Sequence, residues 1–356
     1  MISRTTAIIL SLIVLAVTRV SVGEDSKSLK VAALLGLTGG AAYHSAGIRK
    51  GIELAAEDLK ARGWQIDLRY EDDQTNPTKT VSAMQFLSSQ GYKSFIGPTW
   101  SFQVNAVREI VANNDLVAMV PAGSSEINGG AAQGVFNLCP SRTQQVPYLV
   151  EWLKRQGYHR GFIVTPNGDW GEIHRRVFAR AVKDAGGSVV GEEQFDYGID
   201  ISSLRTILLK GAQVNADVVF TTGAGDDVAN VVRARNALHL SFSILSTADI
   251  RDALALKLVS HADVQQDVFA IGLTVSSDFK MRYMARFGEQ PSLYSDRGYD
   301  ALMILAEATE RTDGSQNAVR SFLNSGVEFS GVSGKIKFDN RGDVGAGDYQ
   351  VFKAAL

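Results

Sequence analysis

The sequence predicts an α/β protein made of two doubly wound parallel-sheet lobes, and three observations support this prediction. Short apolar runs alternate with amphipathic stretches along the chain, and this alternation requires parallel sheets that helices cover on both faces. The apolar runs number about twelve, which is more than one sheet comfortably holds. The same rhythm also repeats in the second half of the chain, although the residues themselves do not repeat.

The first half of the chain supplies the strands and helices of one expected lobe. Strands are expected where apolar residues run together or alternate, at 29–35, 66–70, 94–96, 116–120 and 135–138. Helices are expected where apolar residues recur three or four positions apart, at about 46–62, 76–91 and 104–111. Each strand is therefore followed by a covering helix or by a short loop.

The second half continues in the same way and supplies the other lobe. The expected strands lie at 162–165, 188–194, 216–222, 243–246, 268–275, 335–338 and 349–353. The expected helices lie at 143–156, 172–185, 202–210 and up to about 237, with two more before 313, the second over 299–312.

Two short loops within the stretch Ser94–Glu126 carry the strongest functional signal. Ser101 follows the run at 94–96 and Ser124 follows the run at 116–120, each in a loop with a glycine. In open α/β sheets, ligands bind where neighbouring parallel strands end. A helix start with free N–H groups and a hydroxyl can hold a carboxylate. Either serine could instead only cap a helix, but two such loops in succession favour a binding cleft.

Residues 1–23 have the pattern of a signal peptide. Arg4 gives a basic start, residues 7–17 are apolar, and the small residues Ser21 and Gly23 precede an expected cleavage site. No later run approaches the roughly 18 apolar residues of a membrane span. We therefore expect an exported protein that is free in the periplasm.

Charge and cysteine content narrow the class further. Without the two arginines of residues 1–23, the chain has 34 basic and 38 acidic residues, a net charge of −4. Nothing in this balance indicates binding to nucleic acid or to an anionic membrane. The single Cys139 cannot form an intramolecular disulfide, and it lies too far from the cleavage site to carry a lipid anchor. We expect it to be a small buried residue at a strand end.

Sequence motifs of common enzymes are missing. The glycine-rich segments 36–40 and 223–225 lack the spacing of a P-loop or a dinucleotide-binding turn, and no GxSxG motif occurs. The five histidines include no HxxxH pair, which leaves a zinc site with little support. Glu71, Asp72 and Asp73 could bind a divalent cation, but a solvated acidic cluster at a strand end is the simpler interpretation. We expect no enzyme activity, no cofactor and no metal site.

The mature chain resembles a known family, the type I periplasmic solute-binding proteins of ABC importers, in the branched-chain amino acid (Leu/Ile/Val) subfamily. The motifs that carry the resemblance are, in order, KVAALLGLTG, GIELAAEDL, LRYEDDQTNP, FIGPTWS, VPAGSS, NGDWGE and KIKFDNRGDV. Their order and spacing are specific, although each motif alone is modest.

The resemblance implies two lobes that are joined by three crossovers and that close over a solute. The crossovers are expected near 139–142, 272–276 and 326–334. The first lobe would comprise 28–141 plus 275–330, and the second lobe 142–274 plus 331–356.

The resemblance also assigns roles to individual residues. In the first lobe Ser101, Ala122, Gly123 and Ser124 match the positions that hold the ligand carboxylate.

From the second lobe, Trp170 matches the aromatic residue that shuts over the ligand, and Asp249 matches the acid that pairs with a ligand ammonium group. Two alternatives remain open, since Trp170 could only anchor its loop and Asp249 could only cap the following helix.

Several positions depart from the family pattern and leave the solute open. Tyr43 and His44 stand near a position that is often Tyr, so either ring could line the cleft, or His44 could be a surface residue. Gly225 replaces an aromatic side chain. Arg142 replaces a common Asp and could pair with a second carboxylate or an aromatic acid, or be a solvated hinge residue. Trp100 adds an aromatic ring beside the first loop.

We therefore expect a monomeric, non-enzymatic receptor that delivers a small carboxylate-bearing molecule to an inner-membrane ABC permease. Amino acids and aromatic or other organic acids are the expected solutes. A sensor of the same fold, which reports the solute to a membrane receptor or kinase, is the alternative. A hydrolase or dehydrogenase is a more remote one.

Overall fold

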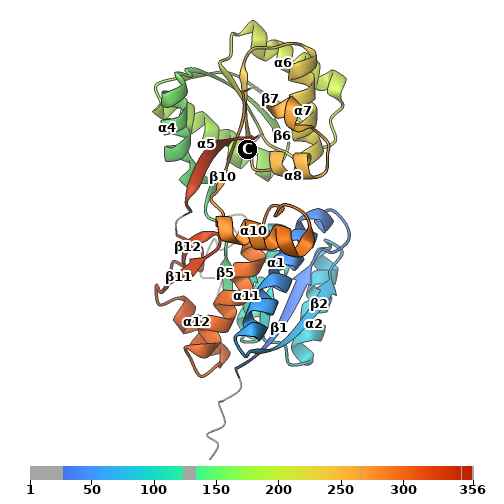
Figure 1. Cartoon of the computed structure of the whole chain (residues 1–356), viewed down its shortest axis with the longest axis vertical. Helices are drawn as coiled ribbons and strands as arrows, with labels where there is room; N and C mark the ends of the chain where they lie inside the picture. Colours follow the sequence, from blue (N-terminus) through green and yellow to red (C-terminus); the bar gives the residue numbers. More distant parts are fainter. Residues whose placement is uncertain (1–26, 123–133, 266, 346, 355–356) are drawn as a thin grey trace, which may run out of the picture.

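The structure is a computed structural model that describes residues 27–122, 134–265, 267–345 and 347–354. Three sequence predictions lie outside these residues, namely the signal peptide at 1–23 and the roles of Gly123 and Ser124. The described residues form two lobes, one above the other in Figure 1. No described helix is long and apolar enough to cross a membrane.

The first lobe is built on a parallel sheet with the strand order β2-β1-β3-β4-β5. Its strands are β1 (Ser28–Leu35), β2 (Gln65–Asp72), β3 (Ser94–Ile96), β4 (Val117–Val120) and β5 (Val135–Asn137). The helices between the strands are α1 (Ala42–Ala61), α2 (Pro77–Ser89) and α3 (Ser101–Asn113). A later part of the chain adds α10 (Ser277–Phe287), α11 (Ser295–Glu310) and α12 (Gln316–Leu323).

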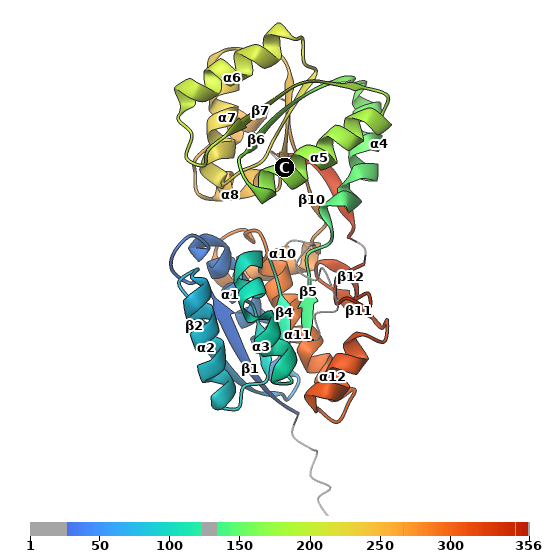
Figure 2. The ribbon, with the colours of Figure 1, turned by 180° about the vertical axis from the view of Figure 1, so that it is seen from behind.

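Helices bury both faces of this sheet, and side chains alternate between the two faces along β1. Val31 and Leu35 point into a core shared with α1 and α11, whereas Ala32 and Leu34 point into a core shared with α2 and α3. Figure 1 shows α1 and α11 on one face of the sheet, and Figure 2 shows α2 and α3 on the other.

The second lobe has the strand order β13-β10-β9-β8-β6-β7. Its strands are β6 (Arg160–Pro166), β7 (Ser188–Phe195), β8 (Val218–Thr221), β9 (Ser243–Thr247), β10 (Val268–Leu273) and β13 (Tyr349–Lys353). Its helical segments are η1 (Arg142–Gln145), α4 (Val146–Gln156), α5 (Asp169–Asp184), α6 (Ile201–Gln213), α7 (Gly225–Ala237), α8 (Ile250–Ala255) and α9 (His261–Val264). The predicted α/β class with two parallel sheets is confirmed.

The last strand, β13, departs from the parallel arrangement. It pairs with β10 in the antiparallel direction, with Leu273 opposite Tyr349. The chain leaves this sheet at the end of β10 and returns beside it, where the Thr274 N–H donates to the Asp348 carbonyl at 2.9 Å. Because the returning strand enters at the edge where β10 ends, it must run the opposite way.

The third predicted crossover needs correction. Residues 331–345, which we expected in the second lobe, pack on the first. The hairpin of β11 (Glu328–Gly331) and β12 (Gly334–Lys337) buries Phe329 and Ile336 in the core of the first lobe. Phe338 joins the same core and contacts Phe136 at a ring distance of 5.2 Å. The hairpin must cover its apolar face, so the chain returns to the second lobe only between Val344 and Tyr349.

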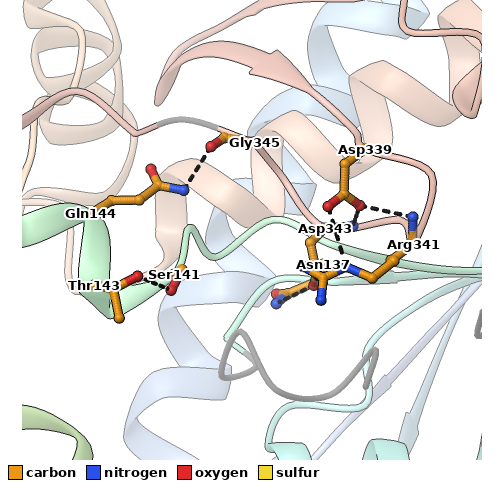
Figure 3. Close-up of polar contacts among 8 residues, drawn as sticks. All are labelled: Asn137, Ser141, Thr143, Gln144, Asp339, Arg341, Asp343 and Gly345. Carbon is orange, nitrogen blue, oxygen red and sulfur yellow. Dashed lines mark hydrogen bonds and ion pairs between the residues drawn. The ribbon is translucent and has the colours of Figure 1, made fainter. Parts of the chain in front are cut away.

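Polar contacts hold together two of the segments that connect the lobes. Figure 3 shows the Gln144 amide, which donates to the Gly345 carbonyl at 2.7 Å, and the Asn137 amide, which donates to Asp343 at 3.4 Å. In addition, Gln144 Oε1 accepts from the Gly347 N–H at 2.9 Å. The first connection and the return segment therefore run side by side.

Candidate functional site

A small cavity lies where the two lobes meet. Its polar lining comprises Arg142, Gln145, Trp170, His174, Thr247, Asp249 and Arg297, together with the phenol rings of Tyr294 and Tyr349. Tyr294 and Arg297 lie at the start of α11 in the first lobe, and the remaining residues belong to the second. Three residues predicted from the sequence, Arg142, Trp170 and Asp249, are therefore brought together.

The cavity has a volume of about 40 Å³, which is room for a few water molecules at most. Sites for small molecules typically enclose about 300–1,000 Å³. A solute of amino-acid size could occupy this position only if the lobes or their side chains shifted.

Trp170 lies near the start of α5, and hydrogen bonds connect it to Asp249. Its indole N–H donates to Thr222 Oγ1 at 2.9 Å. Thr222 and Thr247 share a hydrogen bond of 2.9 Å, and the Thr247 hydroxyl donates to Asp249 Oδ2. Because Trp170 can only donate and Asp249 accepts, every hydroxyl in the series is oriented toward the carboxylate. The two predicted residues are thus parts of one network.

Asp249 follows β9 and precedes α8. Its side chain makes no capping hydrogen bond to α8, so the alternative role as a helix cap is not seen. The residue is 6% exposed, and burial followed by the nearby charge of Asp252 raises its pKa to about 6. A buried carboxylate of this kind favours a cationic partner.

Arg142 lies in η1, directly after the first connection between the lobes. It is 7% exposed, and its guanidinium lies over the Trp170 ring at 5.1 Å. The alternative of a solvated hinge residue is therefore contradicted. Its Nε atom has no hydrogen-bond partner among the described residues.

His174 was not predicted, although it follows Trp170 by four residues and thus lies on the same face of α5. Its Nδ1 lies 2.9 Å from the Trp170 carbonyl, and the two rings are 4.3 Å apart. Burial, with the charge of Arg142, lowers its pKa to about 3, so the ring is neutral. The Nδ1 proton is then donated to the carbonyl, and Nε2 is left as an acceptor without a described partner.

Tyr294 and Arg297 were also not predicted. Tyr294 has a left-handed backbone, with φ of 70° and ψ of 0°, which is unusual for a bulky residue. Arg297 is 4% exposed, and its guanidinium lies 5.1 Å from the centre of the Tyr294 ring. Strained backbone conformations of this kind concentrate at functional sites. In the sequence, the stretch around these two residues is mostly polar and has no strand or helix period that would single them out.

His44 connects the lobes at the edge of this site. Its Nε2 lies 3.2 Å from Asp252 Oδ2, and α1 and α8 belong to different lobes. Its ring packs against Tyr294 at 5.3 Å, Trp100 at 6.4 Å and Tyr43 at 6.1 Å. Burial alone would lower its pKa, but the hydrogen bond and charge of Asp252 raise it overall. His44 is therefore not a simple surface residue.

The donor atoms of His44, Asp249 and Asp252 all lie within 4.8 Å of one another. This grouping could hold a cation, either an ammonium group or a metal ion. The His44–Asp252 hydrogen bond already accounts for two of the three side chains without a metal.

The described residues of the predicted carboxylate site of the first lobe lie outside the cavity. Ser101 is the first residue of α3 and not its cap, because the cap position is taken by Trp100. The Trp100 N–H donates to Gln103 Oε1 at 3.3 Å. Ala122 follows β4 and packs in the core of the lobe. Neither Ser101 nor Ala122 is among the residues that line the cavity.

Gly225 does not line the cavity either. It begins α7, and a Cβ atom there would lie 3.2 Å from the Ala253 backbone nitrogen of α8. A glycine at this position therefore lets α8 approach α7 closely, and the space that an aromatic side chain would take is occupied by α8.

Comparisons with known proteins agree with the fold and the class of protein. The model of a family described as periplasmic binding protein matches residues 28–355. The Leu/Ile/Val-binding protein homolog 3 of Brucella melitensis is 21% identical over 343 residues, which cover 89% of each chain.

Two solved structures illustrate the range of ligands among similar folds. LivJ of Streptococcus pneumoniae in complex with isoleucine is 18% identical, with a TM-score of 0.80 over 93% of this chain and 97% of that one. A solute-binding protein of Rhodopseudomonas palustris in complex with 3,4-dihydroxybenzoic acid is also 18% identical, with a TM-score of 0.79 over 92% and 93%. At this identity the likeness shows the fold alone.

The family match spans nearly all of the described chain and confirms the resemblance found in the sequence. The family consists of solute-binding proteins and not of enzymes. The chain therefore belongs to the periplasmic binding protein family.

Proposed function

We propose that this protein is the periplasmic solute-binding component of an ABC importer, and that it captures a small carboxylate-bearing solute between its lobes. The observation that carries the proposal is the cavity at which Arg142, Trp170 and Asp249 of the second lobe meet Tyr294 and Arg297 of the first. A solute that contacts both lobes stabilises the closed state relative to the open one.

The proposed roles of the residues follow from their chemistry. Ser101 and Ala122, with Gly123 and Ser124, hold one carboxylate at the start of α3 and after β4, where backbone N–H groups favour an anion. Trp170 closes over the solute, and Asp249 pairs with an ammonium group where the solute has one. Micromolar affinity, about −8 kcal/mol, suffices for this role.

The delivery partner is an inner-membrane ABC permease, and the protein acts as a monomer. Solute-binding relatives with isoleucine or with 3,4-dihydroxybenzoic acid support both amino acids and aromatic acids as solute classes.

A thermal-shift screen against amino acids and aromatic acids tests the proposal. We expect at least one acid to raise the melting temperature, and calorimetry to show weaker binding of that acid after Ser101→Ala and after Trp170→Ala. If neither substitution weakens binding of the strongest hit, the assignment of the pocket is wrong.

A further inference from the structure

We propose that the solute carries a second acidic group, which Arg142 and Arg297 receive at the interlobe cavity. The solute would then be a dicarboxylic acid or a related dianion. This inference rests on the proposed function, because it requires that the solute binds at this cavity and that its first carboxylate is held in the first lobe.

Two buried arginines converge on the cavity without an ion-pair partner. Arg142 is 7% exposed and Arg297 is 4% exposed, and the Nε atom of each has no described hydrogen-bond partner. Neither forms an ion pair with any carboxylate in the part of the chain that the structure describes. Burial alone would lower the pKa of Arg297, and the charge of the adjacent Asp296 raises it overall without an ion pair between the two side chains. A buried guanidinium without a paired carboxylate carries a large desolvation cost, which a bound anion would offset.

The charges that line the cavity leave room for one more anion. The charged lining residues are Arg142, Arg297 and Asp249, while His174 is neutral. The lining therefore carries one net positive charge even when Asp249 is ionised. Asp249 also accepts the hydroxyl of Thr247 and is not within ion-pair distance of either arginine. One additional carboxylate would neutralise the net charge of the residues that line the cavity.

The two arginines come from different lobes. Arg142 belongs to η1 of the second lobe and Arg297 to α11 of the first. Two like charges that approach each other across a closing interface oppose closure, and an anion between them reverses the effect. A planar carboxylate matches the donor geometry of a guanidinium, so it can pair with both. The acidic group would thereby join the lobes.

The test compares each dicarboxylic acid with its own monoamide, which has nearly the same size but one charge fewer. Suitable pairs are L-glutamate with L-glutamine, and terephthalate with 4-carbamoylbenzoate. Other diacids and monoacids that raise the melting temperature in the screen are also tested by calorimetry. In calorimetry on the wild-type protein, we expect the strongest-binding diacid to bind at least tenfold more tightly than its monoamide.

Substitutions then show whether the two arginines cause this preference. Arg142→Met and Arg297→Met should each weaken binding of the diacid more than binding of its amide, so that the ratio of acid to amide affinity falls toward one. Arg142→Lys, which keeps the charge, should retain most of the preference. Arg235→Met is the matched control, since Arg235 is 6% exposed in α7 but does not line the cavity.

The outcomes separate this inference from the proposed function. If monoacids or amides bind as tightly as diacids to the wild-type protein, the second acidic group is excluded while the receptor role stands. The same conclusion follows if Arg142→Met lowers the affinity for monoacids and diacids equally, because Arg142 would then hold the first carboxylate. If no carboxylic acid binds at all, the proposed function itself fails. The ratio of diacid to monoamide affinity of the wild-type protein tests the second acidic group even if a variant does not fold.

Discussion

The two lobes differ in how completely the polar groups near the cavity are hydrogen-bonded within the protein. In the first lobe, the polar groups beside the expected carboxylate site bond to one another, since Thr99 Oγ1 accepts from the Gly36 N–H at 3.2 Å and bonds Ser45 at 2.9 Å. In the second lobe, His174 Nε2 and Gln145 Oε1 are buried without a described partner.

This difference indicates a division of labour between the lobes. Buried polar groups are normally hydrogen-bonded, and the exceptions gather where a ligand completes them. We infer that the hydrogen-bonded groups around Thr99 in the first lobe form a rigid scaffold, whereas Arg297 of α11 and the polar lining of the second lobe supply groups that a solute completes. Substitutions in the scaffold should therefore reduce stability, and substitutions of residues that line the cavity should reduce binding.

The largest expected effect is on the scaffold, at the contact between α1 and α11. A Cβ atom on Gly51 would collide with the Ser295 carbonyl oxygen, so Gly51→Ala must push the two helices apart. We expect it to lower the free energy of unfolding by about 3 kcal/mol, as overpacking of a tight contact does. Urea denaturation measures this, and Lys60→Ala on the exposed side of α1 is the control. Equal stability of the Gly51 variant and the wild type would contradict the close packing.

Asp249→Asn should have opposite effects on binding and stability. Because burial raises the pKa of Asp249 from 3.8 to about 6, the folded state holds the proton more tightly than the unfolded state. Ionisation therefore costs stability as the pH rises from about 4 to about 6, by about 3 kcal/mol at neutral pH. Asparagine removes this cost and still accepts from Thr247.

The expected result is a higher melting temperature at pH 7 together with a loss of affinity for amine-bearing solutes of about 100-fold. At about pH 4, where the carboxyl is protonated in the folded state, the difference in melting temperature should nearly vanish. A variant that is less stable than the wild type at pH 7 would show that Asp249 is a structural residue.

Trp170→Ala should weaken solute binding by about 30-fold, with a smaller change in stability, because the ring lines the cavity and is only half-buried. Trp170→Phe keeps an aromatic surface but cannot donate to Thr222, and we expect an intermediate affinity. Calorimetry with the strongest hit of the screen measures both. If the Trp170→Ala variant binds the solute normally but unfolds at a lower temperature than the wild type, the indole only anchors its loop.

The smallest expected effect concerns the contact of His44 with Asp252 between the lobes. The pKa of His44 is raised above its usual value of 6.5 in this arrangement, so protonated His44 stabilises it. That contribution is fully present below about pH 6.5 and is lost as the pH rises through the higher folded-state pKa. His44→Gln should therefore destabilise the protein more at about pH 5.5 than at about pH 8.5, by less than about 1 kcal/mol. A pH-independent difference would argue against the pair.

Most of the fold could be predicted from the sequence because its signals are local. Asn76 caps α2 and the run Leu29–Leu35 is a buried strand, and both follow from capping chemistry and periodicity. The short helix α9 was missed, and α8 was expected only as the helix after Asp249 without bounds, because four and six residues show no period. Residues 331–345 were assigned to the wrong lobe because Phe136, against which Phe338 packs, lies about 200 residues away in sequence.

The site was predictable where the resemblance to the family points to a residue. Trp170 and Asp249 match positions of the family and Arg142 departs from the family pattern, and the structure brings all three to one cavity. Arg297 and Tyr294 could not be predicted, since they come from the start of α11, and only the arrangement of the lobes places them opposite Arg142. Which lobe a residue faces depends on tertiary packing, so it cannot be predicted from a local sequence pattern.

A crystal structure of the protein with the strongest-binding acid tests the central claim most directly. We predict that the solute lies between the lobes, with one carboxylate at the start of α3 near Ser101 and its other end at Arg142, Trp170 and Asp249. A solute that contacts one lobe alone, or that binds away from these residues, would contradict the account.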